Sequence, residues 1–260
     1  MEQRWSDVVR ASRDFDGVTA QEQFLAQFPP TLPEKEIIAT NNVTGDVHTH
    51  RCYEWEAWSF DVPPGVFMPG PTSRLIHERL RSGEIDVRAR RFVSVGAGLG
   101  IETLLAGLAG AKEVAGIDIH EPSVRAARSV YLTYGPSCGA PFTGYVSDLF
   151  ENVDRALHAD IMVFNPPFID VPISSDPAIR RTIASGLPLA RRFFAELASG
   201  AYLDQVGRLY MLLSNTAPLR EILRLALTAN LAIDPVHTQS WSGESTRTYL
   251  FEMRWAGPSA

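Results

Sequence analysis

From residue 91 onward, short apolar runs alternate with segments whose apolar side chains recur at helical spacing. The runs predict seven strands, which span 92–95, 113–119, 144–146, 160–164, 207–213, 231–236 and 248–255. The amphipathic segments predict helices over 102–109, 122–134, 187–197 and 218–228. Because strands that alternate with helices form mostly parallel sheets, we expect an α/β fold with helices on both faces of the sheet.

The residues before this region have a different pattern, from which we expect a small N-terminal α/β extension over residues 1–62. Apolar residues at helical spacing predict two short helices within residues 1–30. The segments 36–40 and 47–59 are predicted to be short strands joined by a turn. We interpret the extension as a cover for a substrate and assign residues 63–260 to one larger domain.

Proline and glycine crowd residues 62–71, which predicts a rigid loop at the start of the larger domain. A helix is expected after this loop, from about 72 to 82, with Thr72 or Ser73 as its N-cap. The loop therefore leads directly into the first helix of the domain.

Composition narrows the possible functions. The 260 residues carry a formal net charge of −6 without any continuous basic stripe, so duplex nucleic acid is a disfavoured partner. The two cysteines, Cys52 and Cys138, lie outside any CxxC pattern, which favours free thiols in a reducing compartment. The N-terminus lacks an apolar signal-like core, and no run approaches the ~20 apolar residues of a membrane span, so we expect a cytoplasmic protein.

Several potential metal ligands lie close together in the extension: Asp46, His48, His50 and Cys52. Alternation along a strand would place the two histidines and the cysteine on one face. Because no second cluster occurs elsewhere in the sequence, we favour a structural role and predict no metal site.

The strand over 92–95 ends in a glycine-rich turn, in which Gly96, Gly98 and Gly100 form a GxGxG arrangement before a helix. Glycine permits a tight turn and lets a ligand approach the backbone, and the start of the helix offers free N–H groups. Taken alone, the motif leaves open a tight turn that binds nothing.

Two acids mark the ends of the next two strands. Asp118 lies where a carboxylate can accept hydrogen bonds from both ribose hydroxyls of a nucleoside, although a helix cap beside Pro122 is the alternative. Asp148 lies where it can accept the exocyclic amine of adenine, with a solvated loop acid as the alternative. Three successive strand ends of this chemistry predict a nucleoside-bearing cofactor at the carboxyl edge of the sheet.

The fourth strand ends in Asn165-Pro166-Pro167-Phe168. Proline lacks an N–H, so this edge offers carbonyl groups that can only accept hydrogen bonds. We predict that the amide oxygen of Asn165 and the carbonyl of Pro166 hold an –NH₂ group, and that Phe168 stacks on a planar amide or ring. Asn165, Pro166 and Phe168 are therefore the expected catalytic residues.

The four motifs together resemble those of class I S-adenosylmethionine (SAM) methyltransferases with an Asn-Pro-Pro-aromatic sequence. This subgroup includes the release-factor glutamine-amide methyltransferases, adenine-amino DNA methylases and some ribosomal RNA guanine methylases. The release-factor type is resembled over roughly residues 60–255, including the lead-in segment 65–69 and the last strands. The resemblance implies a Rossmann-like sheet, SAM as cofactor, and methyl transfer to an amino or amide nitrogen.

The resemblance also implies a set of cofactor-binding residues, in which the lead-in segment lies over SAM. The expected set is Phe67, Pro69, Gly96, Gly98, Gly100, Asp118, Ile119, Asp148, Leu149 and Asn165. The segments 69–73 and 169–176 depart from the release-factor pattern, so the acceptor is expected to be either a small metabolite or a peptide or protein side chain.

Two other functions fit the same cofactor site. The chain could consume SAM without methyl transfer, for instance by cyclising the amino-acid part, or it could be a non-catalytic SAM-binding scaffold. The scaffold hypothesis is disfavoured because a scaffold has no need of Asn165.

Side chains outside the motifs receive a structural interpretation. The aromatic residues Tyr53, Trp55, Trp58 and Phe60 are expected in the core or an interface rather than around a ligand. The arginine pairs at 180–181 and 191–192 are expected on exposed helix faces, with a substrate carboxylate as an alternative partner of the first pair.

Overall fold

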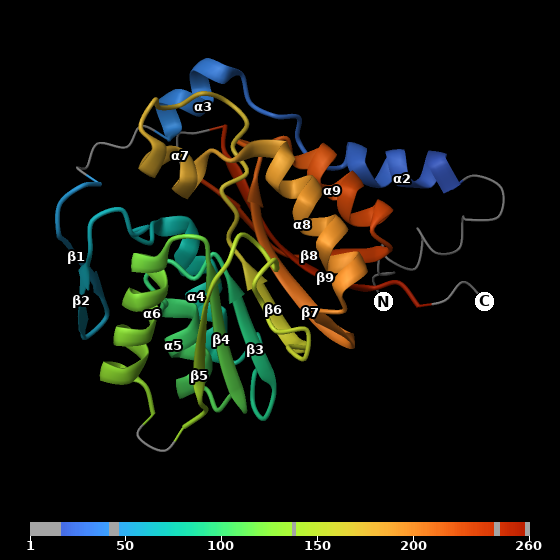
Figure 1. The fold of residues 1–260 in the computed structure, drawn as a ribbon. Helices are drawn as coiled ribbons and strands as arrows, with labels where there is room; N and C mark the ends of the chain where they lie inside the picture. Colours follow the sequence, from blue (N-terminus) through green and yellow to red (C-terminus); the bar gives the residue numbers. More distant parts are fainter. Residues whose placement is uncertain (1–16, 42–46, 137–138, 242–244, 258–260) are drawn as a thin grey trace.

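A seven-stranded sheet lies at the centre of the molecule (Figure 1). The computed structural model describes residues 17–41, 47–136, 139–241 and 245–257. The strand order is β5-β4-β3-β6-β7-β9-β8, and the strands are β3 (Arg91–Val95), β4 (Glu113–Asp118), β5 (Phe142–Val146), β6 (Ala159–Phe164), β7 (Leu203–Ser214), β8 (Leu231–Ser240) and β9 (Arg247–Trp255). Among the strands of this described sheet, only β9 runs in the opposite direction to the others. This confirms the predicted Rossmann-like, mostly parallel architecture.

Helices cover both faces of the sheet because side chains alternate along each strand. Val93 and Val95 of β3 belong to one buried cluster with α2 (Gly17–Ala26), α8 (Gly186–Gly200) and α9 (Leu219–Thr228). Phe92 belongs to the opposite cluster with α4 (Pro71–Ser82), α5 (Ile101–Leu108) and α6 (Glu121–Tyr134). None of the helices in the described residues is long and apolar enough to span a membrane.

The extension adds a helix and a hairpin to this core. Residues predicted as a strand over 36–40 form the helix α3 (Glu34–Thr40) instead. The Ile37-Ile38 pair suggested a strand, but Glu34 and Glu36 in the first turn favour a helix and Ile37 alone is buried. The first predicted helix, within residues 1–16, lies outside the described residues.

The segment predicted as one strand over 47–59 turns back on itself. It supplies β1 (Arg51–Trp55) and the start of β2 (Trp58–Val62), which pair antiparallel. Tyr53, Trp55 and Phe60 are buried in the cluster of α4, α5 and α6, and Trp58 packs against that cluster. The interpretation of these aromatic residues as core is therefore confirmed.

Two local predictions require correction. The N-cap of α4 is Gly70, followed by Pro71, and neither Thr72 nor Ser73 caps the helix. Proline suits this position because its missing N–H would have no partner in the first turn. The short helix α7 (Pro177–Ile183) carries the arginine pair at 180–181, but its bounds were not predicted because none of its residues is buried in an apolar stripe.

Gly100 determines how closely α5 and α6 can pack. Its φ of +85° lies in the left-handed region, and it forms the N-cap of α5. A Cβ at this position would lie 2.5 Å from Cα of Ala127 on α6, which is far inside contact distance. The third glycine of the GxGxG motif therefore serves the packing of two helices.

We predict that Gly100→Ala lowers the free energy of unfolding by about 2–5 kcal/mol, because backbone strain and overpacking add together. Gly83→Ala is the matched control: Gly83 also has positive φ, at +80°, but a Cβ on it would meet no atom within 4 Å. Urea denaturation followed by circular dichroism gives both values. Equal losses in the two variants would contradict the packing role of Gly100.

Candidate functional site

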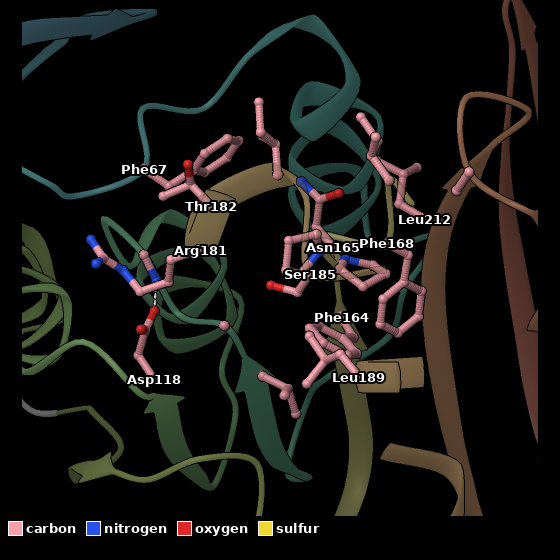
Figure 2. A pocket seen from close by; sticks show the side chains of 18 of the residues that line it. Phe67, Asp118, Phe164, Asn165, Phe168, Arg181, Thr182, Ser185, Leu189 and Leu212 are labelled. Carbon is pink, nitrogen blue, oxygen red and sulfur yellow. Dashed lines mark hydrogen bonds between the residues drawn. The ribbon is translucent and has the colours of Figure 1, made fainter. Parts of the chain in front are cut away.

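A cavity of about 660 Å³ opens at the carboxyl edge of the sheet. This volume is in the range of small-molecule and cofactor sites. The cavity lies where the strand order reverses, because β3 pairs with β4 on one side and with β6 on the other. Figure 2 shows Asp118 and Arg181 toward one end, with Asn165, Phe168 and Leu212 toward the other.

Most of the sequence-predicted site residues converge on this cavity. Those that line it are Phe67, Gly96, Gly98, Asp118, Ile119, Asp148, Leu149, Asn165, Pro166 and Phe168. Gly100 and Pro69 are not among the lining residues, whereas Met68 and Gly70 on either side of Pro69 are. Of the described part of the extension, Asn41 at the end of α3 reaches the cavity.

The glycine turn after β3 borders the cavity. Gly96 and Gly98 have φ of +66° and +52°, which favour glycine. A Cβ on Gly98 would lie 3.7 Å from Cβ of Phe67, so the lead-in segment lies directly over the turn. Gly96 is exposed and lines the cavity, so a ligand can approach its backbone, whereas Gly98 is buried beneath Phe67.

Asp118 is held rigidly at the end of β4. Its Oδ2 accepts a hydrogen bond from the Gly98 N–H at 2.9 Å, and its Oδ1 accepts one from the His120 N–H at 2.9 Å. Burial raises the pKa of this carboxyl, and the two backbone hydrogen bonds and Arg181 oppose that rise. Because a carboxylate oxygen can accept more than one hydrogen bond, both oxygens can still receive ligand hydroxyls.

Arg181 of α7 closes this end of the cavity. Its Nη2 donates to the carbonyl oxygen of Gly65 at 2.9 Å, which ties α7 to the lead-in loop. Burial, followed by the charges of Arg181 and Arg125, lowers the pKa of His120, which favours the neutral imidazole. Arg181 was expected on an exposed helix face, but it is partly buried and lines the cavity.

Asp148 has a partner that the sequence did not reveal. Nη1 of Arg192 on α8 donates to Oδ2 of Asp148 at 2.8 Å, and both residues line the cavity. The hydrogen bond raises the pKa of Arg192, so the guanidinium stays charged. Leu149, which follows, is buried with φ of +51°, so the turn is tightly constrained.

The amide of Asn165 is oriented by the first helix of the larger domain. Its Nδ2 donates to Oγ of Ser73 at 3.2 Å, and Ser73 on α4 is buried. Within the described residues, Oδ1 of Asn165 has no hydrogen-bond donor, which leaves it available to a ligand. Ser73 therefore supports the site through Asn165, a contact that the sequence did not predict.

The two prolines fix the edge that follows Asn165. The carbonyl of Pro166 accepts from the Phe168 N–H at 2.9 Å, and that of Pro167 accepts from the Ser185 N–H at 2.7 Å. Phe168 is only 1% exposed, and its ring meets that of Phe164 edge-on at 5.6 Å. Phe168 thus forms part of a rigid apolar wall of the cavity.

Few titratable side chains line the cavity. Among its described lining residues, the carboxylates are Asp118 and Asp148, the cations are Arg181 and Arg192, and no His, Lys or Cys occurs. The part around Asn165 is lined by neutral hydroxyls and apolar groups. None of the described lining residues is therefore a histidine that could act as a general base.

The potential metal ligands of the extension have other partners. Nε2 of His48 pairs with Asp176 at 2.7 Å, and Nδ1 of His50 pairs with Asp61 at 3.0 Å. Sγ of Cys52 lies 3.0 Å from Oγ of Ser59. No group of three or more potential metal ligands occurs within the residues that the structure describes, and Asp46 and Cys138 lie outside them.

The chain is similar to known proteins in sequence and in fold. No family model matches the chain. A relative from Methanocaldococcus jannaschii, named "Putative protein N5-glutamine methyltransferase", is 27% identical over 177 residues, which cover 65% of this chain and 83% of the relative.

Solved structures share the fold. One is the 16S rRNA methyltransferase RsmC of T. thermophilus in complex with AdoMet and guanosine, with TM-score 0.57, 22% identity, and coverage of 80% of this chain and 51% of that one. Another is the E. cuniculi Mtq2–Trm112 complex, responsible for methylation of the eRF1 termination factor, with TM-score 0.52, 19% identity, and coverage of 74% and 99%. The fold of the chain is thus that of class I methyltransferases.

We predict that the affinity for S-adenosylhomocysteine depends on ionised Asp118. Because the pKa of Asp118 is raised, its carboxylate becomes protonated at a higher pH than an ordinary aspartate does. Calorimetric titrations should show affinity falling on the acid side, with a midpoint above the ordinary value of 3.8. Asp118→Asn should bind S-adenosylhomocysteine about 10-fold or more weakly at pH 7, and its affinity should no longer fall as the pH is lowered. If the variant keeps the wild-type pH profile, Asp118 is not the group that causes the fall in affinity.

Proposed function

We propose that this chain is a SAM-dependent N-methyltransferase that modifies a neutral side-chain amide of a peptide or protein. The observation that carries the proposal is the orientation of Asn165, whose Nδ2 donates to buried Ser73 and whose Oδ1 remains available beside the cavity. The amide oxygen of Asn165 and the carbonyl of the adjoining Pro166, which can accept a second bond beside that from the Phe168 N–H, are acceptors suited to an –NH₂ group.

The residues present fit SAM. Gly96 offers an exposed backbone at the cavity, Asp118 retains acceptor capacity for two ribose hydroxyls, and Asp148 retains capacity for an exocyclic amine. The volume of about 660 Å³ accommodates both this cofactor and part of an acceptor. When bound, SAM supplies an electrophilic methyl group on a sulfonium.

The residues at Asn165 would align the acceptor and polarise its nitrogen. Oδ1 of Asn165 and the carbonyl of Pro166 would each accept one N–H of the acceptor, which fixes the direction of the nitrogen lone pair. Phe168 and Leu212 would form the apolar wall beside the amide. Neither Asp118 nor Asp148 is hydrogen-bonded to Asn165. After methyl transfer, the extra proton on the acceptor nitrogen would therefore leave to water. Positioning then supplies most of the rate.

An amide is favoured over an ammonium group as the acceptor. The lining near the end of β7 consists of Leu212, Leu213, Ser214, Thr216 and Ala217, none of which can neutralise a cation. The relative from M. jannaschii carries a name that specifies protein glutamine as its substrate, which supports the same class of acceptor.

The exposed free thiol of Cys52 fits a reducing compartment, and we propose the cytoplasm.

Incubation with methyl-labelled SAM and synthetic peptides tests the proposal. Peptides that contain one Gln should gain one methyl group on the side-chain nitrogen, with release of S-adenosylhomocysteine, while otherwise identical Lys or Glu peptides should not. Formation of methylthioadenosine from SAM alone would instead indicate a reaction without methyl transfer. Preferential methylation of the Lys peptide would contradict the neutral-amide acceptor.

We predict that Asn165→Ala lowers kcat about 100-fold or more, because it removes an acceptor that aligns the substrate nitrogen. The affinity for S-adenosylhomocysteine should change far less, since Asp118 and the glycine turn are intact. Single-turnover kinetics and calorimetry measure the two effects. Full turnover by this variant would exclude the proposed role of Asn165.

We also predict that Ser73→Ala lowers kcat by about 10- to 100-fold, because the amide of Asn165 loses its orienting partner. Ser94→Ala is the matched control, since Ser94 is another buried serine that does not line the cavity. The control should retain wild-type kcat. A proportional loss of kcat in both variants would indicate a general effect of the cavity left by serine truncation.

A further inference from the structure

Asp148 is held from the side by a residue that the cofactor motifs do not include. From this contact we infer that Arg192 is a positioning residue that determines the specificity of the site for the 6-amino base of its cofactor. The inference rests on the proposed function, and it adds a residue of α8 to the part of the site that recognises the base.

A closed set of hydrogen bonds links α8 to the turn after β5. Nη1 of Arg192 donates to Oδ2 of Asp148 at 2.8 Å, and Nη2 donates to Oε1 of Glu196 at 3.4 Å. Oε2 of Glu196 accepts from the backbone N–H of Phe150 at 3.2 Å. The carboxylate of Asp148 and the backbone of its own turn are therefore held by two side chains one helical turn apart on α8.

This arrangement leaves one oxygen of Asp148 for a ligand. Arg192 engages Oδ2, and no donor among the described residues engages Oδ1. Asp148, Ile119 and Leu149 all line the cavity. An ionised oxygen fixed there accepts a hydrogen bond from a 6-amino group, whereas the oxygen of a 6-oxo base would repel it.

The role of Arg192 is separable from stability. The side chains of Arg192 and Asp148 are 48% and 33% exposed. Ion pairs with this degree of exposure contribute little to folding. Removing the guanidinium should therefore free the orientation of Asp148 without unfolding the protein, and the signature is a change in base preference.

Calorimetric titration with S-adenosylhomocysteine and S-inosylhomocysteine tests this inference on the intact chain. Wild type should prefer the adenosyl compound by about tenfold or more. Arg192→Gln should reduce that ratio at least about fivefold, and Arg192→Lys should retain part of it because it keeps a charge but not the planar fork. Arg191→Gln is the matched control, because Arg191 precedes Arg192 on α8, is exposed and does not line the cavity.

Each outcome decides a different point. Suppose that wild type prefers the adenosyl compound and that Asp148→Ala abolishes the preference. An unchanged ratio of affinities in Arg192→Gln would then overturn the role of Arg192 and leave that of Asp148 intact. A ratio that falls equally in Arg191→Gln would overturn it as well. If wild type binds neither compound, the proposed function fails with it. A selective fall in Arg192→Gln, with melting temperatures of all variants within about 3 °C of wild type, supports the inference.

Discussion

Parallel pairing of β3 with β4 on one side and with β6 on the other is the constraint on which the rest of the structure depends. Parallel strands end at the same edge, so the turns that follow them are brought together whatever their separation in sequence. The glycine turn, Asp118 and Asn165 share one cavity for this reason. Reversal of the strand order at β3 leaves the gap between its two neighbours open, and the cavity occupies it.

Residues from outside the strand ends then give the cavity its precision. Ser73 of α4 orients Asn165, and Arg192 of α8 holds Asp148. These supporting residues lie on helices of opposite faces of the sheet, so both layers contribute to the one edge. A site built in this way combines backbone groups that a ligand can approach with side chains whose orientation is fixed before it binds.

The sequence predicted the parts of the site that depend on local chemistry. A glycine turn, an acid at a strand end and an Asn-Pro-Pro segment each have a meaning that a short stretch of residues conveys, and the alternation of strands and helices placed them at one edge. The sequence could not predict partners that only tertiary contact brings together. Ser73 and Asn165 are 92 positions apart, and Arg192 and Asp148 are 44 apart.

Local errors also have physical causes. The prediction of a strand over 36–40 was based on the two adjacent residues Ile37 and Ile38. Only Ile37 is buried in the fold, and a helix can bury one residue of such a pair. The GxGxG motif was treated as one cofactor-binding unit, whereas Gly100 packs against Ala127 and is not among the lining residues of the cavity. Helix packing and ligand approach both require glycine, and the sequence alone does not distinguish them.

A crystal structure with S-adenosylhomocysteine tests the central claim most directly. The account predicts the ribose hydroxyls on Asp118, the base beside Asp148, and the sulfur atom facing Asn165 with room for an acceptor amide between them. A ligand whose sulfur points away from Asn165, or that binds outside this cavity, would contradict it.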